Sequence, residues 1–374
     1  MNIIVAADSY KGSLSSIEVG KAIRRGMQQA LPAASISVIP MADGGEGTLD
    51  AFQFLFKGET ISFSCLDPRG KQHQATYGLI KEKKLAIIES ALIVGLTHLK
   101  KSSTSPLETT SFGVGQCLLH AIDHGAEEII IGLGGSGTND GGIGLLEALG
   151  AKFYSKGSQL THVKARHLDE IDQIDLTTLD PRVKTCTITI AADVENPLFG
   201  DHGATAVFGP QKGVTPELHD ILEKGMINYA SVIDPSASFS SLKGAGAAGG
   251  LGFALLLLNA SIRSGAELLY DYLHLEEKLQ QADLLISGEG KTDEQTMYGK
   301  APFFLAQKAK QVDVPVIFIS GSLGSGLEQL STSVDACFSI VPKPATLEES
   351  MNKAALWVED TAYQIGKVLS IQQK

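Results

Sequence analysis

Residues 129–140, with the sequence IIIGLGGSGTND, join a short apolar run to a glycine-rich turn and a group of hydroxyl, amide and carboxylate side chains. Residues 284–293 (LLISGEGKTD) repeat this order, and residues 39–48 (IPMADGGEGT) follow a related pattern. Glycine lets a backbone approach a ligand closely, and in α/β proteins ligands gather at the carboxyl ends of the strands. The three loops together predict an α/β protein that handles a polyanionic substrate with a metal ion.

The two ends of the chain predict a parallel sheet. A strand at residues 2–7, a helix that begins with a capping box of Ser15 and Glu18, and a strand at residues 36–39 form a β-α-β unit. Further strands are expected at residues 283–287, 314–320 and 336–341, alternating with helices at residues 301–311, 324–331 and 346–370. Topology rules make these strands parallel neighbours of the N-terminal ones.

The middle of the chain has a different pattern. Short strands at residues 61–65, 75–80 and 85–89, with no helix between them, predict an antiparallel meander. A helix over residues 106–124 and strands at residues 128–133 and 186–193 should follow. We therefore predict a discontinuous Rossmann-like α/β domain, residues 1–58 plus 280–374, and an inserted second α/β domain, residues 59–279, with a mixed or antiparallel part.

The composition excludes several classes of protein. The 374 residues are 43% hydrophobic with a formal net charge of −11, so we expect a folded core and no nucleic-acid binding. No charged residue lies between Lys243 and Arg263, but only residues 253–258 are strongly apolar, which favours a buried turn and a core helix over a membrane span. The N-terminus begins as a strand rather than a signal peptide, and the four cysteines form no CxxC pair, so a cytoplasmic protein is expected.

The loop after the first strand contains Asp8, Lys11 and Ser13. Helix N-termini attract anions through free N–H groups, and Lys11 adds a positive charge, so this loop is a candidate phosphate or carboxylate site. The alternative is an ordinary polar turn with an N-cap. On the first interpretation, Asp8 and Ser13 bind the substrate or its phosphate and Lys11 takes part in catalysis.

Carboxylates stand beside glycines in all three loops. A Mg²⁺ ion bound with ATP usually takes one or two protein carboxylates. The candidate metal ligands are Asp43, Asp140, Glu289 and Asp293. For Asp43 the alternative is a negative charge that stabilises a helix N-terminus.

Residues 134–142 form the most specific stretch, with five glycines in nine residues. So many glycines are costly to order, and a backbone nest that binds an anion would explain them. The candidate binding residues in this loop are Gly134, Gly135, Ser136, Thr138 and Asn139.

Asp193 stands at the end of a predicted strand. It could accept the proton of a substrate hydroxyl or bind Mg²⁺, and the competing interpretation is that it caps the following Asn-Pro turn. Lys212 follows in the glycine-rich segment FGPQKG and is a candidate for binding an anion.

Gly288, Gly290 and Lys291 form another candidate phosphate site. The segment ends in GKT like a Walker P-loop, but Leu285 replaces the first glycine of that motif, so a non-Walker site is the remaining possibility. Residues 244–249 (GAGAAG) match the G-x-G-x-x-G pattern of dinucleotide sites, although no convincing strand precedes them. An NAD-dependent oxidoreductase of a small hydroxy acid is therefore an alternative.

The chain resembles the glycerate kinase type-1 family, the bacterial ATP-dependent glycerate kinases. The matching stretches are DSYKGSLSS, PMADGGEGT, GLGGSGTNDGG, AADVENPLFG, GATAVFGPQKG, GAGAAGGLG and ISGEGKTDEQTMYGKAP, in family order from residue 8 to residue 302. Tyr10 and Lys291 stand where the family pattern has Phe and Arg, and both keep the chemical character of the position.

The resemblance implies phosphoryl transfer from ATP to D-glycerate with Mg²⁺, usually to the 2-hydroxyl, while the residues themselves leave the 3-hydroxyl open. ATP and D-glycerate would then be the small-molecule partners. Lys11, Lys212 and Lys291 become candidates for contacts with carboxylate or phosphate, and Asp193 for the base or a metal ligand. A nucleotide-sensing protein without turnover is a further alternative, which the retained carboxylates and lysines disfavour.

Overall fold

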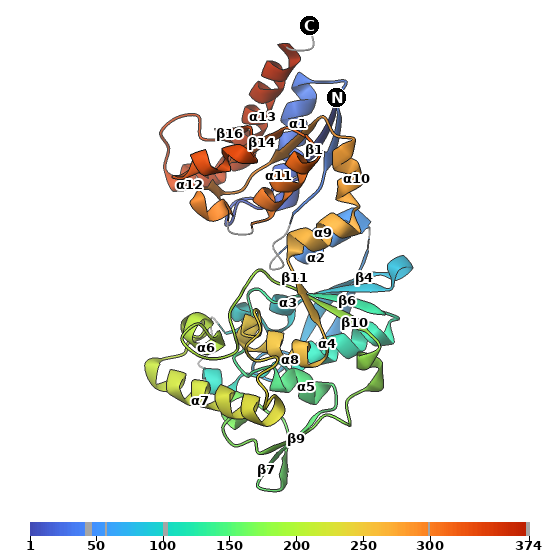
Figure 1. The fold of residues 1–374 in the computed structure, drawn as a ribbon, viewed down its shortest axis with the longest axis vertical. Coiled ribbons are helices and arrows are strands. Elements are labelled where there is room, and N and C mark those ends of the chain that lie inside the picture. The colour runs from blue at the N-terminus through green and yellow to red at the C-terminus, as the bar shows by residue number, and fades with distance from the viewer. Residues whose placement is uncertain (42–46, 57, 100–103, 298–299, 372–374) are drawn as a thin grey trace. The chain divides into compact units, whose positions relative to one another are not determined.

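The computed structural model describes residues 1–41, 47–56, 58–99, 104–297 and 300–371. The chain is an α/β protein with parallel and mixed sheets, as predicted (Figure 1). Its contacts define two compact units: unit 1 comprises Met1–Asp43 and Gly265–Lys374, and unit 2 comprises Gly44–Ser264. These boundaries differ from residues 58 and 280, because helix α2 (Thr48–Phe56) packs on strands of unit 2 and helix α9 (Gly265–Tyr272) packs on helices of unit 1.

Unit 1 contains a five-stranded sheet in the order β16-β14-β12-β1-β2, and every pairing is parallel. The strands are β1 (Asn2–Val5), β2 (Ser35–Val38), β12 (Leu284–Ser287), β14 (Val316–Ser320) and β16 (Ala336–Ser339). The expected parallel sheet from both chain ends is therefore confirmed. Its strand order reverses between β1 and β12, and in open α/β sheets ligands bind at such a switch point.

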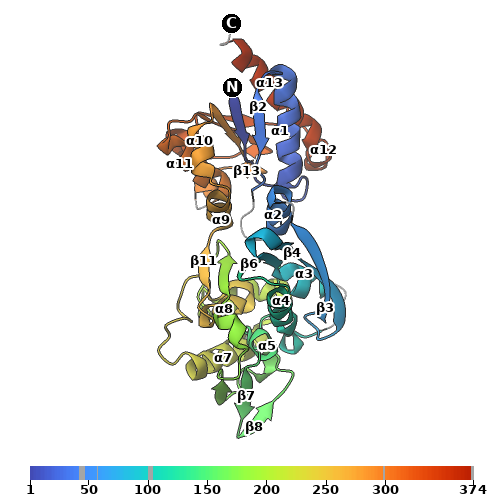
Figure 2. The same cartoon turned by 90° about the vertical axis from the view of Figure 1, so that its right-hand side faces the viewer.

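Helices cover both faces of this sheet. Figure 2 shows α1 (Ser16–Ala30) and α13 (Ala354–Ile371) on one side, and α10 (Leu275–Gln280) and α11 (Ala301–Gln311) on the other. The predicted capping box of Ser15 and Glu18 begins α1. Gly26 lets α1 and α13 approach closely, because a Cβ atom there would lie 2.1 Å from the Glu359 carbonyl oxygen.

Two helix predictions in the C-terminal part differ from the structure. Residues 324–331 contribute only to a 3₁₀ turn, Leu327–Thr332. The single helix expected at 346–370 is divided into α12 (Leu347–Asn352) and α13.

Unit 2 contains a six-stranded mixed sheet in the order β11-β10-β6-β5-β4-β3. The strands are β3 (Glu59–Leu66), β4 (Gln72–Ile80), β5 (Leu85–Glu89), β6 (Glu128–Gly132), β10 (Thr187–Ala191) and β11 (Ser261–Arg263). The expected antiparallel meander of β3, β4 and β5 is confirmed, and β5, β6, β10 and β11 run parallel. The carboxyl ends of four strands therefore lie along one edge of this sheet.

Helix α4 (Phe112–Asp123) starts later than the predicted residue 106. Residues 106–108 form a separate 3₁₀ turn and Thr109 is extended, because the next residues reach toward a buried carboxylate described below. Helix α5 (Ile143–Ala148) packs against α4, and α8 (Leu251–Leu257) packs against α5.

A small sheet of polar strands was not predicted: β8 (Ser158–Leu160), β7 (Lys152–Ser155) and β9 (Gln173–Asp175). Helices α3 (Ser90–Val94), α6 (Ala204–Phe208) and α7 (Pro216–Ile233) complete the unit. Within the described ranges, no helix of either unit combines the length and the apolar character that a membrane crossing needs.

Candidate functional site

In unit 1, the loops after β1 and β12 lie against each other at the switch point. The Asp8 N–H donates to the Gly288 carbonyl oxygen over 2.8 Å. A Cβ atom on Gly290 would lie 3.4 Å from Tyr10 Cα and 3.6 Å from the Lys11 nitrogen. Lys11 is exposed at this edge. The structure thus brings together candidate residues that are about 280 positions apart in the chain, as expected for neighbouring parallel strands.

Gly288 occupies a position that only glycine fits. Its φ is +144°, and a Cβ atom there would lie 1.8 Å from the Ile319 carbonyl oxygen. The same carbonyl accepts a hydrogen bond of 2.8 Å from the Tyr10 hydroxyl. The ends of β1, β12 and β14 are therefore joined at one point.

The two acidic candidates of this loop are paired with lysines. Glu289 accepts hydrogen bonds of 2.6 Å from Thr296 Oγ1 and from Lys300 Nζ. Asp293 lies 2.8 Å from Lys291 Nζ, and the hydrogen bond from that lysine holds the pKa of Asp293 below its usual value. Both carboxylates already have cationic partners at this edge of the sheet.

Other unit 1 candidates have different surroundings. Ser13 precedes the first residue of α1 by three positions, and its hydroxyl donates to the Met351 carbonyl oxygen over 2.7 Å, so it does not face a helix N-terminus. Asp8 is 8% exposed and its Oδ1 accepts from the Ser9 N–H. Asp43 lies outside the described residues.

In unit 2, the glycine-rich loop follows β6 at the edge where the parallel strands end. The last residues of β5 and β10, Glu89 and Ala191, both pair with Gly132 of β6. Gly134 and Gly135 are exposed, and the φ of Gly135 is +71°, in the left-handed region that glycine supplies. Asp193 is exposed two residues beyond the end of β10.

Lys212 reaches this loop from the 3₁₀ turn Pro210–Lys212. The residue is only 6% exposed. Its Nζ donates to Ser136 Oγ over 3.1 Å and to the Thr138 carbonyl oxygen over 2.7 Å. Burial lowers the pKa of Lys212 to about 7, and the negative charge of Asp140 opposes this shift. A buried amine that can hold a positive charge near neutral pH thus lies against the loop.

Asp140 is fully buried and accepts four hydrogen bonds from the chain. Its Oδ2 accepts from the Ser111 N–H (2.7 Å), the Ser111 hydroxyl (2.8 Å) and the Gly144 N–H (3.4 Å), and its Oδ1 accepts from the Gly142 N–H (3.1 Å). Burial raises the pKa of Asp140, against these hydrogen bonds. The carboxylate joins the first turns of α4 and α5, which explains why α4 begins at Phe112.

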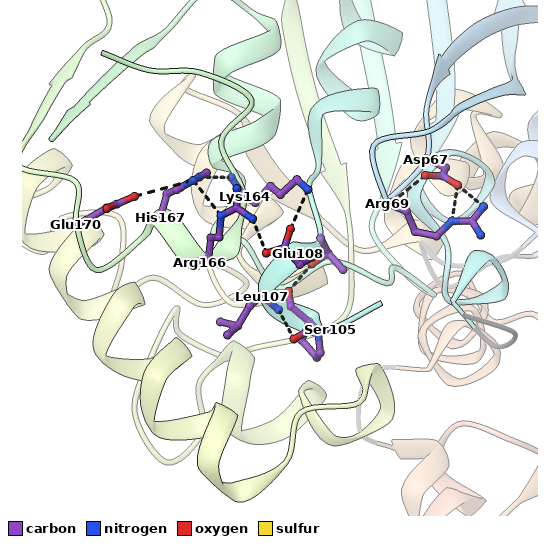
Figure 3. Close-up of polar contacts among 11 residues, drawn as sticks. Asp67, Arg69, Ser105, Leu107, Glu108, Lys164, Arg166, His167 and Glu170 are labelled. Carbon is purple, nitrogen blue, oxygen red and sulfur yellow. Dashed lines mark hydrogen bonds and ion pairs between the residues drawn. The ribbon is translucent and has the colours of Figure 1, made fainter. Parts of the chain in front are cut away.

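Ion pairs flank the segment that carries Ser111. Glu108 contacts both Lys164 and Arg166, and the buried Asp67 binds the guanidinium of Arg69 (Figure 3). Burial favours the neutral acid, but hydrogen bonds from Arg69 and Lys71 hold the pKa of Asp67 below its usual value. Glu108 thus holds the chain just before residues 109–111, and the turn of Asp67 and Arg69 holds the segment itself, because the Thr110 N–H donates to the Pro68 carbonyl oxygen over 3.0 Å.

The GAGAAGG segment has a packing role. A Cβ atom on Gly249 would lie 2.1 Å from the Thr138 carbonyl oxygen, and one on Gly250 would lie 2.5 Å from Gly141 Cα. No strand immediately precedes the segment in the described chain, as a dinucleotide site would require. Its glycines let this segment pack directly against the backbone of the β6 loop. Packing thus explains the glycines, and the G-x-G-x-x-G match no longer favours an NAD site.

Glu89 and Ser90 were not among the sequence candidates. Glu89 ends β5, is 7% exposed, and accepts a hydrogen bond of 2.9 Å from the Leu49 N–H at the start of α2. The signal was present in the sequence, because a carboxylate and a hydroxyl follow the apolar run of residues 85–88. Asp193 was selected because it is a polar residue at the end of a predicted strand, and the same rule would have selected Glu89 and Ser90.

No cluster of three or more His, Cys, Asp or Glu side chains suited to a metal ion occurs among the residues that the structure describes. A Mg²⁺ ion that accompanies a nucleotide needs fewer protein ligands than such a cluster, because phosphates and water supply the others. The carboxylates of the two adjoining unit 1 loops, Asp8, Glu289 and Asp293, are therefore candidates for such a site.

Comparison with known proteins identifies the family. The model of the Glycerate kinase family matches residues 3–370. The chain belongs to the glycerate kinase family. It is 43% identical to a glycerate kinase of Bacillus cereus over 99% of this chain and 98% of that protein. It is also 40% identical to the Escherichia coli protein named glycerate 2-kinase, over 95% of this chain and 94% of that one.

A solved structure agrees with this assignment. A crystal structure of a Salmonella typhimurium LT2 protein described as a glycerate kinase 2 matches with a TM-score of 0.89 and 42% identity, covering 100% of this chain and 99% of that one. Family and fold together show that the chain is an enzyme of the kinase type. Membership of a kinase family implies ATP as the co-substrate.

Proposed function

We propose that the enzyme transfers the terminal phosphoryl group of ATP to the 2-hydroxyl of D-glycerate, giving 2-phosphoglycerate and ADP. The observation that carries this proposal is the near full-length similarity to the E. coli protein named glycerate 2-kinase. Phosphoryl transfer depends mainly on positioning and on stabilisation of charge, and glycine-rich loops with lysines at strand ends supply both.

Unit 1 is the proposed phosphate-binding part. Its glycine-rich loop after β12 lies beside Lys11 at the switch point, and Lys291 is largely exposed beside Asp293. Gly290 is partly exposed and leaves the backbone open to a phosphate, whereas Gly288 lets the loop pack against the Ile319 carbonyl oxygen. In this role Lys11 neutralises the charge that develops on the transferred group.

The carboxylates of unit 1 fit a Mg²⁺ ion better than Asp140 does. The four hydrogen bonds to the fully buried Asp140 all come from N–H or O–H donors of the chain, so a cation bound there would displace internal hydrogen bonds. Asp8, Glu289 and Asp293 lie in the two adjoining loops, and they would serve as oxygen ligands once the cation displaces the lysine partners of Glu289 and Asp293. Bound there with the nucleotide, Mg²⁺ would neutralise phosphate charge.

Unit 2 is the proposed acceptor-binding part. Lys212, held by Ser136 and Thr138, can pair with the carboxylate of glycerate. Asp193 is exposed beyond the neighbouring strand β10, where it can accept the proton of the attacking hydroxyl.

A turnover assay tests the proposal. The enzyme is incubated with ATP, Mg²⁺ and D-glycerate, and the product is identified by phosphorus NMR. A 2-phosphoglycerate signal is expected, with a large loss of rate in the Asp193→Asn variant. A 3-phosphoglycerate signal would overturn the regiochemistry, and folded enzyme without phosphorylated glycerate would overturn the substrate.

A further inference from the structure

Several buried polar atoms around the β6 loop have no hydrogen-bond partner. Across the described parts of the chain, five buried side-chain atoms lack one: Ser90 Oγ, Thr138 Oγ1, Asn139 Oδ1, Glu223 Oε2 and Tyr229 OH. Thr138 and Asn139 belong to the loop, and Ser90 follows the adjoining strand β5. The Tyr229 ring packs near Gly141. Because buried polar groups are normally paired, such a concentration requires an explanation.

Thr138, which Asn139 follows directly in the chain, contacts the buried amine of Lys212. The Thr138 carbonyl oxygen accepts from Lys212 Nζ over 2.7 Å. Lys212 has two acceptors in the chain, Ser136 Oγ and this carbonyl, whereas an ammonium group has three donors. One donor of Lys212 is thus available for an anion, and the residue whose carbonyl it contacts, Thr138, carries one of the unpaired atoms.

The type of each unpaired atom restricts the ligand. The Asn139 amide nitrogen donates to Thr205 Oγ1 over 3.0 Å, which leaves its carbonyl oxygen, a pure acceptor, without a donor. An ionised phosphate group offers acceptors and cannot fill this role. A hydroxyl group can, and the Thr138 hydroxyl can bond to it as donor or acceptor.

A small hydroxy acid carries both required groups, a carboxylate for Lys212 and a hydroxyl for the two unpaired atoms. We infer that Thr138 and Asn139 determine specificity by hydrogen-bonding a hydroxyl of the hydroxy-acid substrate whose carboxylate binds Lys212. This inference rests on the proposed function, and it names the atoms by which the same site distinguishes its substrate from deoxy analogues. A site that bonds a substrate hydroxyl discriminates strongly against the analogue that lacks it.

The test uses the isosteric variant Thr138→Val in the full-length enzyme. Three ligands are compared by calorimetric binding and as substrates or inhibitors: D-glycerate, D-lactate without the 3-hydroxyl, and 3-hydroxypropionate without the 2-hydroxyl. In the wild type we expect weaker binding of both analogues. In the variant, D-glycerate should bind roughly tenfold more weakly than in the wild type. The affinity for the analogue that lacks the bound hydroxyl should change little.

The stability of the ligand-free protein separates a binding role from a structural one. Thr138→Val removes an unpaired hydroxyl, so its melting temperature should equal or exceed that of the wild type. Tyr229→Phe is the matched control, because it removes another unpaired hydroxyl, and its preference among the three ligands should equal that of the wild type.

The outcomes distinguish this inference from the proposed function. A lower melting temperature of Thr138→Val with an unchanged ligand preference would show that the hydroxyl is structural, for instance through a buried water molecule, and would overturn the inference while turnover of D-glycerate remains. Loss of the preference in the variant supports the inference, even if the wild type binds D-glycerate and forms no phosphoglycerate. In that last case only the proposed function fails.

Discussion

Lys212 shows how one buried side chain can make stability depend on pH. Burial lowers its pKa to about 7 from the ordinary lysine value of 10.5. Between these values the unfolded chain binds a proton that the folded chain does not, so the free energy of unfolding rises with pH. Below pH 7 the amine is charged in both states, and its burial costs the most.

A Lys212→Met variant tests this reasoning. Its advantage in unfolding free energy over the wild type should be largest below pH 7 and should shrink as the pH rises toward 10.5. Urea unfolding followed by circular dichroism at several pH values measures the difference between the two proteins. A difference that is constant across this range would mean that Lys212 has the same pKa in the folded protein as in the unfolded chain.

Asp140 and Asp193 were both sequence candidates, and the structure gives them opposite surroundings. Asp140→Ala leaves buried N–H groups of Ser111 and Gly142 unpaired, so we expect a loss of at least ~3 kcal/mol in unfolding free energy. Asp193→Ala changes an exposed side chain and should alter stability by less than about 0.5 kcal/mol while it abolishes turnover. Chemical denaturation and the phosphoryl-transfer assay check both variants. If the Asp140→Ala enzyme kept normal stability but its activity depended less on Mg²⁺, Asp140 would be a metal ligand after all.

At the scale of elements, the loop after β12 contains two glycines with different constraints. Gly288→Ala places a Cβ atom against the Ile319 carbonyl at 1.8 Å and should prevent correct folding of unit 1. Gly290→Ala makes only ordinary contacts of 3.4 Å or more, so it should fold and instead weaken ATP binding. Soluble yield, circular dichroism and nucleotide titration compare the two. Equal tolerance of both changes would contradict the described loop geometry.

Tyr10 joins two loops of the same sheet edge. Tyr10→Phe removes the hydrogen bond to the Ile319 carbonyl and should lower the unfolding free energy by about 1 kcal/mol. The ring stays buried in the unit 1 core, so the fold should persist. Differential scanning calorimetry of the variant beside the wild type measures the change, and an unchanged transition would mean that water replaces the phenol without cost.

The elements that could be predicted are those whose pattern is local. Apolar runs such as Leu284–Ser287 located the sheet strands, because strands buried on both faces need continuous apolar residues. The polar strands β7, β8 and β9 carry no such run and were missed. The start of α4 depends on Asp140, and the surroundings of Ser13 depend on Met351, 338 positions away. Contacts of this kind have no local signal.

The candidate site, like the elements, could be predicted only where its pattern is local. Glycines followed by polar residues marked the loops after β6 and β12, and Asp8, Lys11 and Ser13 marked the loop after β1, since the strand-end rule needs only the order of residues. The rule could not tell a carboxylate with four internal donors from one that faces solvent. Asp140 and Asp193 therefore looked alike in the sequence, and Glu289 gave no sign of its pairing with Lys300.

At the scale of the whole molecule, each unit has its own hydrophobic core. The core residues of unit 2 and those of unit 1 form distinct clusters, and the single tryptophan, Trp357, belongs to the core of unit 1. Phe253→Ala, in the core of unit 2, should create a cavity that costs about 3–5 kcal/mol. The transition seen by circular dichroism should then shift while that seen by Trp357 fluorescence changes little. Coincident shifts would mean that the chain unfolds as one cooperative system.

The discontinuous make-up of unit 1 has a consequence for biosynthesis. Strand β1 lies between β2, made soon after it, and β12, which the ribosome delivers roughly 250 residues later, on the order of tens of seconds at bacterial elongation speeds. During that delay unit 2, which is continuous in sequence, can complete its own core, while the β1-α1-β2 segment exposes an apolar, unpaired strand edge. The nascent amino-terminal segment should therefore be the part of this enzyme that most needs a chaperone.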